Sequence, residues 1–383
     1  MPKLIRITTV PFSLANLLKG QSKFMTANGF EVIGVSSPGK FLDVVEKEQD
    51  IKTVAIPMTR KISPFADLKS LWHLYKFLKK EKPDIVHTHT PKAGTLGMLA
   101  AYLAKVPIRL HTIAGLPLLE ATGAKRKLLD TVEKITYKCA TKIYPNSFGL
   151  EKIIIKNNYT KKEKLKVIGH GSSNGIDTSE FNPELVSKAT CADLRKNLNI
   201  QKNDFVFLFV GRVVTDKGIN ELIAAFTQLH QQHQGIQLVI VGPYENHLDP
   251  LKPETEKQIN SNPNIHPVGF RDNVKDYFAM ADVLTFPSYR EGFPNVVMQA
   301  AAMQRNAIVS DINGCNEIIN HGENGWIVPV KNVDQLQERM LWCLENQEVS
   351  KQMGLRSRKL MQEKYERAFV WEELLKEYRE LLG

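Results

Sequence analysis

Two cations stand five residues apart in the stretch FVGRVVTDKG, residues 209–218. An apolar run ends at Gly211, Arg212 and Lys217 follow, and Gly218 precedes a helical pattern. Glycine lets the backbone turn tightly, and cations beside the first turn of a helix attract phosphate groups. The same spacing also suits two solvated cations in an ordinary strand-to-helix loop. The stretch is therefore a candidate phosphate site with a plain structural alternative.

A carboxylate opens a second stretch with the same layout, ADVLTFPSYREGFPNVVMQA, residues 281–300. Glu291 comes just before Gly292, Phe293 and Pro294, where a helical pattern begins. Free N–H groups at the start of a helix bind anions or hydroxyls, and Glu291 can accept hydrogen bonds from sugar hydroxyls. Gln299 lies about two helical turns further on and could reach the far end of the same ligand. A charge that merely complements the helix dipole is the alternative.

Histidines supply a third group of candidates. His87 and His89 end the apolar run DIVHTHT and share one face of a strand, because side chains alternate along it. Metal binding, ligand contact and a structural role all remain open for this pair, and the sequence offers no third metal ligand. His111, and Lys92 in the first turn of a helix that begins at Pro91, are further candidates for contact with a sugar or an acceptor.

Strands must alternate with helices to position these residues. Six apolar runs in the first half and six in the second are interleaved with amphipathic stretches such as residues 65–81, which predicts βαβ units and parallel sheets. The expected strands are residues 4–10, 31–37, 53–58, 84–90, 108–113, 142–147, 205–211, 237–242, 265–270, 283–288, 306–311 and 325–330.

The pattern restarts after the Gly/Ser/Asn-rich stretch 169–177, which predicts two doubly wound, Rossmann-like α/β domains facing across a cleft. We expect an N-terminal domain at 1–168, a C-terminal domain at 169–365, and a helix at 366–383 that crosses back toward the first domain. A chain of 383 residues suits two domains.

Charge is unevenly distributed along the chain. Residues 1–168 carry 29 Lys/Arg and 13 Asp/Glu, whereas the remainder carries 22 and 28. A basic first half predicts an anionic partner such as a membrane, a nucleic acid or a phosphorylated substrate, or else a solvated lysine-rich surface. No nucleic-acid-binding module is recognisable. The start lacks a signal-peptide pattern, and four scattered cysteines favour neither a zinc site nor disulfides, so we expect a cytoplasmic protein.

Three motifs in this order resemble those of family 4 glycosyltransferases, which have the GT-B fold. They are Gly211-Arg212-x4-Lys217-Gly218, Asn174-Gly175-Ile176-Asp177 and Glu291-Gly292-Phe293-Pro294. The stretches GHGSSNGID and DINGCNEII resemble the subgroup that extends lipid-linked bacterial surface polysaccharides.

The resemblance implies roles for the matching residues. Arg212 and Lys217 would bind the diphosphate of a nucleotide-sugar, and Glu291 would bind the donor sugar. The N–H groups of Phe293, Asn295 and Val296 would assist, whereas Pro294 has no N–H. The loop 266–271 would read the base through backbone groups near Phe270 and Arg271.

Two positions depart from the family pattern. Gln299 replaces a second Glu, although an amide still offers an oxygen acceptor to ribose hydroxyls. Ala114 stands where many relatives have a His, and His111 lies three residues earlier.

The expected function is retaining, metal-independent transfer of a sugar, with a UDP-sugar as donor and a polyprenyl-diphosphate-linked saccharide as acceptor. The chain lacks an Asp-x-Asp pair, and no cofactor or metal is expected. Lys76, Lys79, Lys80 and Lys82 around a helix with aromatic residues predict attachment to the inner face of the cell membrane. The alternatives are a nucleotide-sugar-binding protein with weakened catalysis and another GT-B enzyme such as an epimerase.

Overall fold

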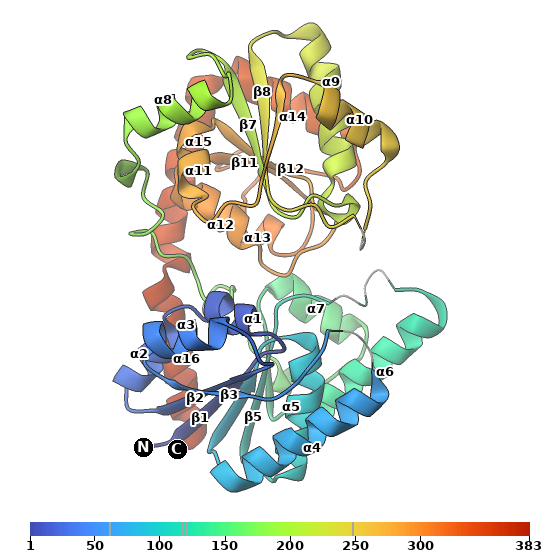
Figure 1. Ribbon diagram of the computed structural model, residues 1–383, viewed down its shortest axis with the longest axis vertical. Helices are drawn as coiled ribbons and strands as arrows, with labels where there is room; N and C mark the ends of the chain where they lie inside the picture. The colour runs from blue at the N-terminus through green and yellow to red at the C-terminus, as the bar shows by residue number, and fades with distance from the viewer. Residues whose placement is uncertain (61–62, 117, 119–120, 247–248) are drawn as a thin grey trace. The chain divides into compact units, whose positions relative to one another are not determined.

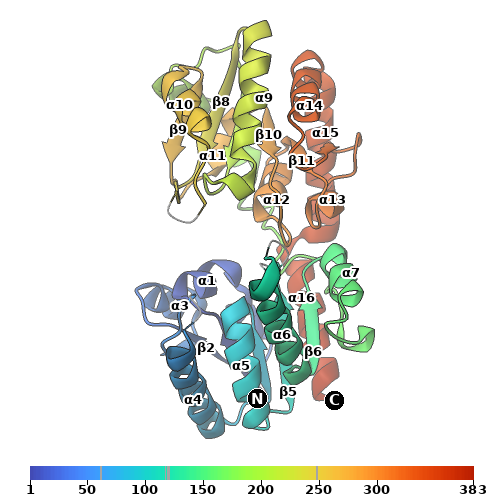
Figure 2. The ribbon, with the colours of Figure 1, turned by 90° about the vertical axis from the view of Figure 1, so that its right-hand side faces the viewer.

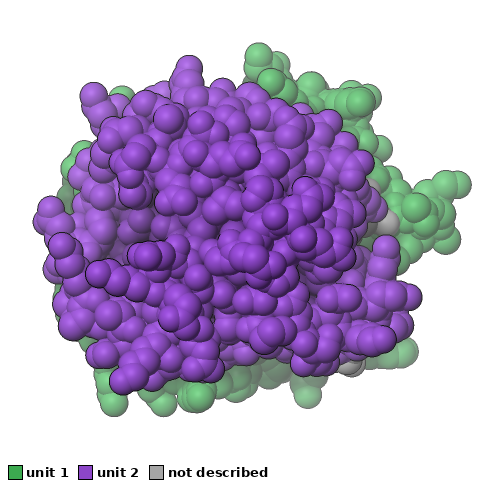
Figure 3. Space-filling model, turned by 90° about the horizontal axis from the view of Figure 1, so that it is seen from above, with its two compact units in different colours: residues 1–175, 367–383 green, residues 176–366 purple. Residues whose placement is uncertain are grey.

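The computed structural model describes residues 1–60, 63–116, 118, 121–246 and 249–383. The chain forms two α/β units. The first comprises residues 1–175 and 367–383, and the second comprises residues 176–366. Figure 1 draws the chain as a ribbon, and Figure 3 colours the first unit green and the second purple. The first unit runs to Gly175 rather than to residue 168, and the last helix belongs to it.

The first unit is built on a parallel sheet with the strand order β3-β2-β1-β4-β5-β6. Long apolar runs suit parallel strands because helices cover both faces of such a sheet. All six strands expected in the first half are confirmed: β1 Lys3–Ile7, β2 Glu31–Ser36, β3 Lys52–Ala55, β4 Ile85–Thr88, β5 Ile108–Ile113 and β6 Lys142–Pro145.

Two apolar clusters lie on the two faces of this sheet. Leu74 of α4, Ala100 of α5 and Tyr137 of α6 belong to one cluster, and the three helices lie side by side in Figure 2. Leu14 of α1 and Tyr378 of α16 belong to the other. The helices are α1 Pro11–Leu17, α2 Gln21–Ala27, α3 Phe41–Gln49, α4 Pro64–Glu81, α5 Pro91–Leu103, α6 Gly123–Cys139, α7 Phe148–Lys156 and α16 Arg367–Leu382.

Helix α4 buries only part of the surface that its large apolar residues form: Leu71 and Tyr75 are partly buried against the core. Ser70, Leu74 and Leu78, each four residues apart, are buried, and the Ser70 hydroxyl donates to backbone carbonyls. Leu68 and Trp72 share the helical spacing of the apolar residues, yet they are 66% and 52% exposed. The helix thus has a buried apolar face and a second apolar surface in solvent.

The second unit repeats the topology, with the strand order β12-β11-β10-β7-β8-β9, again parallel throughout. The six strands expected in the second half are confirmed, and one apolar cluster fills this unit. The strands are β7 Phe205–Val210, β8 Ile236–Val241, β9 Ile265–Gly269, β10 Val283–Phe286, β11 Asn306–Ser310 and β12 Trp326–Val328.

Helices surround the second sheet, and a π-helical segment, Met361–Tyr365, follows the last of them. They are α8 Lys188–Asn197, α9 Ile219–Gln232, α10 Pro253–Ser261, α11 Lys275–Met280, α12 Asn295–Ala302, α13 Cys315–Ile318, α14 Val333–Glu345 and α15 Gln347–Leu360. Within the described part of the chain, no helix combines the length and apolarity needed to cross a bilayer.

Candidate functional site

The loops that follow β7 and β10 bring the two sequence motifs together. These strands are neighbours at the centre of the second sheet, and the strand order reverses there, because β8 follows β7 on one side and β11 follows β10 on the other. Ligands of doubly wound sheets bind at such a switch point, beyond the carboxyl ends of the strands. The sheet topology therefore places Arg212, Lys217 and Glu291 where a ligand is expected.

Gly218 lets the two loops approach closely. Its φ of 72° is left-handed, and a Cβ added there would lie 2.0 Å from the carbonyl oxygen of Pro287. No side chain fits in that space. The short 3₁₀ turn Thr215–Lys217, which comes just before it, is therefore held against the loop that carries Glu291.

Both predicted cations form ion pairs in this site. The Lys217 ammonium lies 2.5 Å from Oε1 of Glu291, which also accepts a hydrogen bond of 2.9 Å from the Ser288 hydroxyl. The Arg212 guanidinium donates to Oε2 of Glu245 at 2.9 Å. The structure thus brings together the three residues to which the family resemblance assigns the diphosphate and the sugar.

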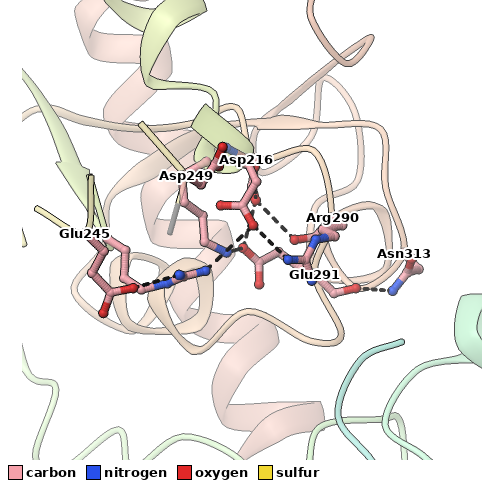
Figure 4. Close-up of polar contacts among 9 residues, drawn as sticks. Asp216, Glu245, Asp249, Arg290, Glu291 and Asn313 are labelled. Atoms are coloured by element: carbon pink, nitrogen blue, oxygen red, sulfur yellow. Dashed lines mark hydrogen bonds and ion pairs between the residues drawn. The ribbon is translucent and has the colours of Figure 1, made fainter. Parts of the chain in front are cut away.

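Asp216 links the two loops further, and the sequence reasoning missed it. Its carboxylate accepts a hydrogen bond of 2.9 Å from Arg290 and lies 3.7 Å from Arg212 (Figure 4). Its backbone N–H donates to Asp249 at 2.6 Å. Asp216 lies inside the first motif, next to Lys217, and Arg290 lies immediately before the second, next to Glu291; that adjacency was the available signal.

The pKa of Arg212 reflects these partners. Burial alone lowers the pKa of its guanidinium, but the hydrogen bond to Glu245 and the charge of Asp216 outweigh burial and leave the pKa above its ordinary value. Arg212 is therefore a permanent cation whose side chain is still 38% exposed.

The loop after β11 supports the backbone beside Glu291. The side-chain amide of Asn313 donates to the carbonyl oxygens of Glu291 and Gly292 (Figure 4). At Gly314, with φ 78°, an added Cβ would lie 2.3 Å from the Gly292 oxygen. These contacts fix the turn from which the Glu291 side chain extends.

Helix α12 begins directly after this turn. The N–H groups of Val297 and Met298 both donate to the carbonyl of Pro294, so those of Asn295 and Val296 precede the first helical hydrogen bond. Phe293 is buried, and its ring packs against Tyr365. Gln299 lies in the second turn of the helix and is partly exposed.

Of the stretch 266–271 that was expected as a base-reading loop, residues 266–269 lie in strand β9, and only Phe270 and Arg271 follow it. Phe270 is 57% exposed, and Arg271 donates to the Phe270 carbonyl at 2.9 Å and to the Tyr277 hydroxyl at 3.2 Å. An aromatic ring in solvent beside a fixed guanidinium offers a stacking surface and a hydrogen-bond donor. The backbone of Gly269, with φ 72°, turns the chain here.

The three candidate histidines of the first unit, His87, His89 and His111, are buried. His87 is 1% exposed, and its ring nitrogens lie 2.5 Å from the Tyr378 hydroxyl and 2.7 Å from that of Thr112. Burial, together with the charge of Arg6, holds the pKa of His89 well below its ordinary value. Ligand contact by a ring nitrogen of His87 would require the hydrogen bond of that nitrogen to break.

His89 and His111 differ in what their nitrogens meet. Nε2 of His89 is buried without a hydrogen-bond partner among the described residues, and the ring lines a cavity of about 20 Å³. His111 accepts or donates at 2.8 Å with Thr88, and burial lowers its pKa to about 4. No group of three metal-binding side chains occurs among the residues that the structure describes.

Lys92 is placed as expected, in the first turn of α5, but it is paired. Its ammonium lies 2.5 Å from Oδ2 of Asp67 in α4, and its side chain is 14% exposed. An acceptor diphosphate that reached Lys92 would have to compete with this carboxylate.

Comparison with known proteins places the chain in a family. Residues 14–147 match the family model "Glycosyl transferase 4-like", and residues 192–360 match "Glycosyl transferases group 1". Over 380 residues the chain is 33% identical to the capsular polysaccharide biosynthesis glycosyltransferase CapM of Staphylococcus aureus, covering 99% of this chain and 97% of that one. The chain belongs to the group 1 glycosyltransferases.

Another relative of this group 1 glycosyltransferase is an Escherichia coli UDP-Gal:α-D-GlcNAc-diphosphoundecaprenol α-1,3-galactosyltransferase. The two are 33% identical over 295 residues, 75% of this chain and 73% of the relative. Among solved structures, Anabaena HepE in complex with UDP and glucose superimposes with a TM-score of 0.82 and 17% identity, covering 99% of this chain and 100% of HepE. That likeness shows a common GT-B fold.

Proposed function

We propose that this glycosyltransferase moves a sugar from a UDP-sugar to a saccharide carried on a polyprenyl diphosphate, in the synthesis of a bacterial surface polysaccharide. The observation that carries the donor half is the cluster of Arg212, Lys217 and Glu291 at the switch point of the second sheet. The acceptor half is supported by two relatives, one named for capsular polysaccharide biosynthesis and one for a diphosphoundecaprenol-linked acceptor.

Donor binding would exchange partners within the cluster. The ammonium of Lys217 and the guanidinium of Arg212 bind the diphosphate, and Glu291, released from Lys217, accepts hydrogen bonds from sugar hydroxyls. A diphosphate presents several anionic oxygens where each carboxylate presents two, which favours this exchange. As the bond to the sugar breaks, both cations stabilise the negative charge that develops on the leaving UDP.

The rest of the nucleotide is assigned to the surrounding loops. Backbone groups at Phe270 and Arg271 bind the base, and the Gln299 amide oxygen accepts from the ribose. The N–H groups of Phe293, Asn295 and Val296 face the donor at the start of α12, with Gly211 and Gly292 giving the backbone room to approach. The replacement of a carboxylate by Gln299 weakens, without abolishing, the ribose contact, because neutral hydrogen bonds are about half as strong.

The proposed reaction retains the configuration of the anomeric carbon and uses no metal ion. The acceptor hydroxyl attacks from the face that UDP leaves, and the departing phosphate oxygen takes its proton. Two cations at the diphosphate supply charge that a divalent ion supplies in transferases with an Asp-x-Asp pair. The sequence contains no such pair.

The first unit is assigned to the acceptor and the membrane. Phe65, Leu68 and Trp72 follow one face of α4 and are 92%, 66% and 52% exposed. The Lys76 ammonium lies 4.9 Å from the centre of the Trp72 ring, and Lys79 and Lys80 follow in the last turn. An apolar stripe bordered by lysines suits the headgroup region of an anionic bilayer. This proposal places the protein at the inner face of the cell membrane as a peripheral protein.

Purified enzyme, a panel of UDP-sugars and a synthetic polyprenyl-diphosphate saccharide test the function. We expect a UDP-sugar to yield a lengthened glycolipid in the presence of EDTA, with the donor's anomeric configuration preserved in the product by NMR. UDP binding without transfer to any glycolipid would support the binding-protein alternative. An altered sugar formed without acceptor would support an epimerase.

A further inference from the structure

One carboxylate of the second unit holds two guanidinium groups. Oδ2 of Asp216 lies 2.9 Å from Nη2 of Arg290 and 3.7 Å from Nη2 of Arg212. The two Nη2 atoms are therefore no farther apart than the sum of these distances. The oxygens of one diphosphate can bridge such a separation, and arginine binds phosphate oxygens in pairs.

The backbone ties Arg290 to the turn that carries Lys217. The Tyr289 N–H donates to the Asp216 carbonyl at 2.9 Å. The backbone of Gly218 also lies so close to the carbonyl oxygen of Pro287 that no side chain fits between them. Two ion pairs connect the loops side by side: Lys217 pairs with Glu291, and Asp216, the residue before Lys217, pairs with Arg290, the residue before Glu291 (Figure 4). A phosphate that reaches Arg212 and Lys217 is thus also close to Arg290.

The charges of this cluster are balanced before any ligand binds. Arg212, Lys217 and Arg290 pair with Asp216, Glu245 and Glu291. The Arg212 and Arg290 side chains are 38% and 35% exposed, whereas that of Asp216 is 12% exposed. Because a guanidinium has five N–H donors, a diphosphate can bind the exposed donors of both arginines while Asp216 keeps its own contacts.

We propose that Arg290 is a third cation of the diphosphate site, positioned beside Arg212 by their common partner Asp216. This inference rests on the proposed donor site. It assigns to the residue before Glu291 a phosphate-binding role that the family motif does not include. Arg290 adds a charge to the donor side of the cluster, whereas Asp216 acts only through the two guanidinium groups that it holds.

Isothermal titration calorimetry, with UDP and uridine each measured as a ligand, tests the role of Arg290. We expect Arg290→Gln to raise the Kd of UDP about tenfold or more, the effect of one lost hydrogen bond to a charged group, and to leave that of uridine unchanged. Arg290→Lys should recover part of the loss. The matched control is Arg356→Gln, which removes an exposed arginine hydrogen-bonded to the Glu323 carbonyl elsewhere in the same unit.

Each outcome decides between roles. Equal losses for UDP and uridine, or a lowered Tm with both variants, would show that Arg290 only supports the loop. Unchanged UDP affinity in Arg290→Gln would overturn the inference while leaving the proposed function intact. A wild-type protein that binds no UDP would instead remove the proposed donor itself.

Discussion

Glu291 has two side-chain partners in this structure, Lys217 and the Ser288 hydroxyl. Only the contact with Lys217 must change when a donor binds, because the Ser288 hydroxyl can keep its hydrogen bond while the carboxylate also accepts from a sugar hydroxyl. The arrangement keeps a basic and an acidic group close together without a buried, unpaired charge, which would be costly.

Removal of either diphosphate cation should reduce turnover strongly. We expect Arg212→Ala and Lys217→Ala to cost at least about 2 kcal/mol of transition-state stabilisation, roughly 30-fold in kcat/KM, because each loses one electrostatic donor. Steady-state kinetics on purified protein measures this. Lys351→Ala is the control, since that lysine forms an exposed pair with Glu348. Near-normal turnover of both variants would contradict the diphosphate assignment.

Sequence reasoning found the residues of the motifs but not how they pair. Arg212, Lys217 and Glu291 carry recognisable spacing, and the twelve expected strands were confirmed because long apolar runs mark buried parallel strands. Glu245 reaches Arg212 only because β8 lies next to β7, and Asn313 reaches Glu291 only because β11 lies next to β10. Strand order is a tertiary property, so these partners could not be found by spacing alone.

Helix α4 shows the same limit at the scale of an element. Its extent was predictable from spacing, but spacing did not separate the apolar residues that contact the core from those in solvent, because neighbouring elements determine that choice. The pairing of Asp67 with Lys92 joins the first turns of α4 and α5. The exposed stripe Phe65, Leu68 and Trp72 begins at that same end of the helix.

We expect the stripe to drive binding to anionic vesicles. Wild-type protein should co-sediment with vesicles that contain phosphatidylglycerol, and less so at high salt, since each lysine near the surface contributes about 1 kcal/mol that salt screens. The double variant Phe65→Ser with Trp72→Ser should stay in the supernatant. Leu355→Ser, at an exposed leucine of α15, is the control. Sedimentation that is independent of lipid charge and salt would refute this surface.

At the scale of the molecule, the buried histidines make stability depend on pH. Burial holds the pKa values of His87 and His89 well below their ordinary value, and that of His111 at about 4. Their neutral forms favour the folded state, so their contribution is present above the unfolded pKa, about 6.5, and is lost as pH falls. Glu133 and Asp282, whose pKa values burial raises, act oppositely, because their protonated forms favour the folded state as pH falls.

We therefore expect unfolding free energy to decrease between pH 7.5 and pH 5.5. Each fully buried histidine should contribute roughly 1 kcal/mol to this decrease, since the unfolded chain takes up a proton that the folded chain excludes. Denaturant titrations at several pH values measure the slope. A flat profile across this interval would mean that these rings take up protons in the folded protein as readily as in the unfolded chain.

Helix α16 completes a unit that the chain left nearly two hundred residues earlier. Its Tyr378 hydroxyl meets both Arg6 and His87, and Leu374 and Leu375 join the apolar cluster with Leu4. During translation, residues 176–366 therefore emerge before the first unit has all of its core. Residues 176–366 can fold first. Residues 1–175 remain without α16 until synthesis ends, and the apolar surface that α16 covers is exposed to chaperones during that time.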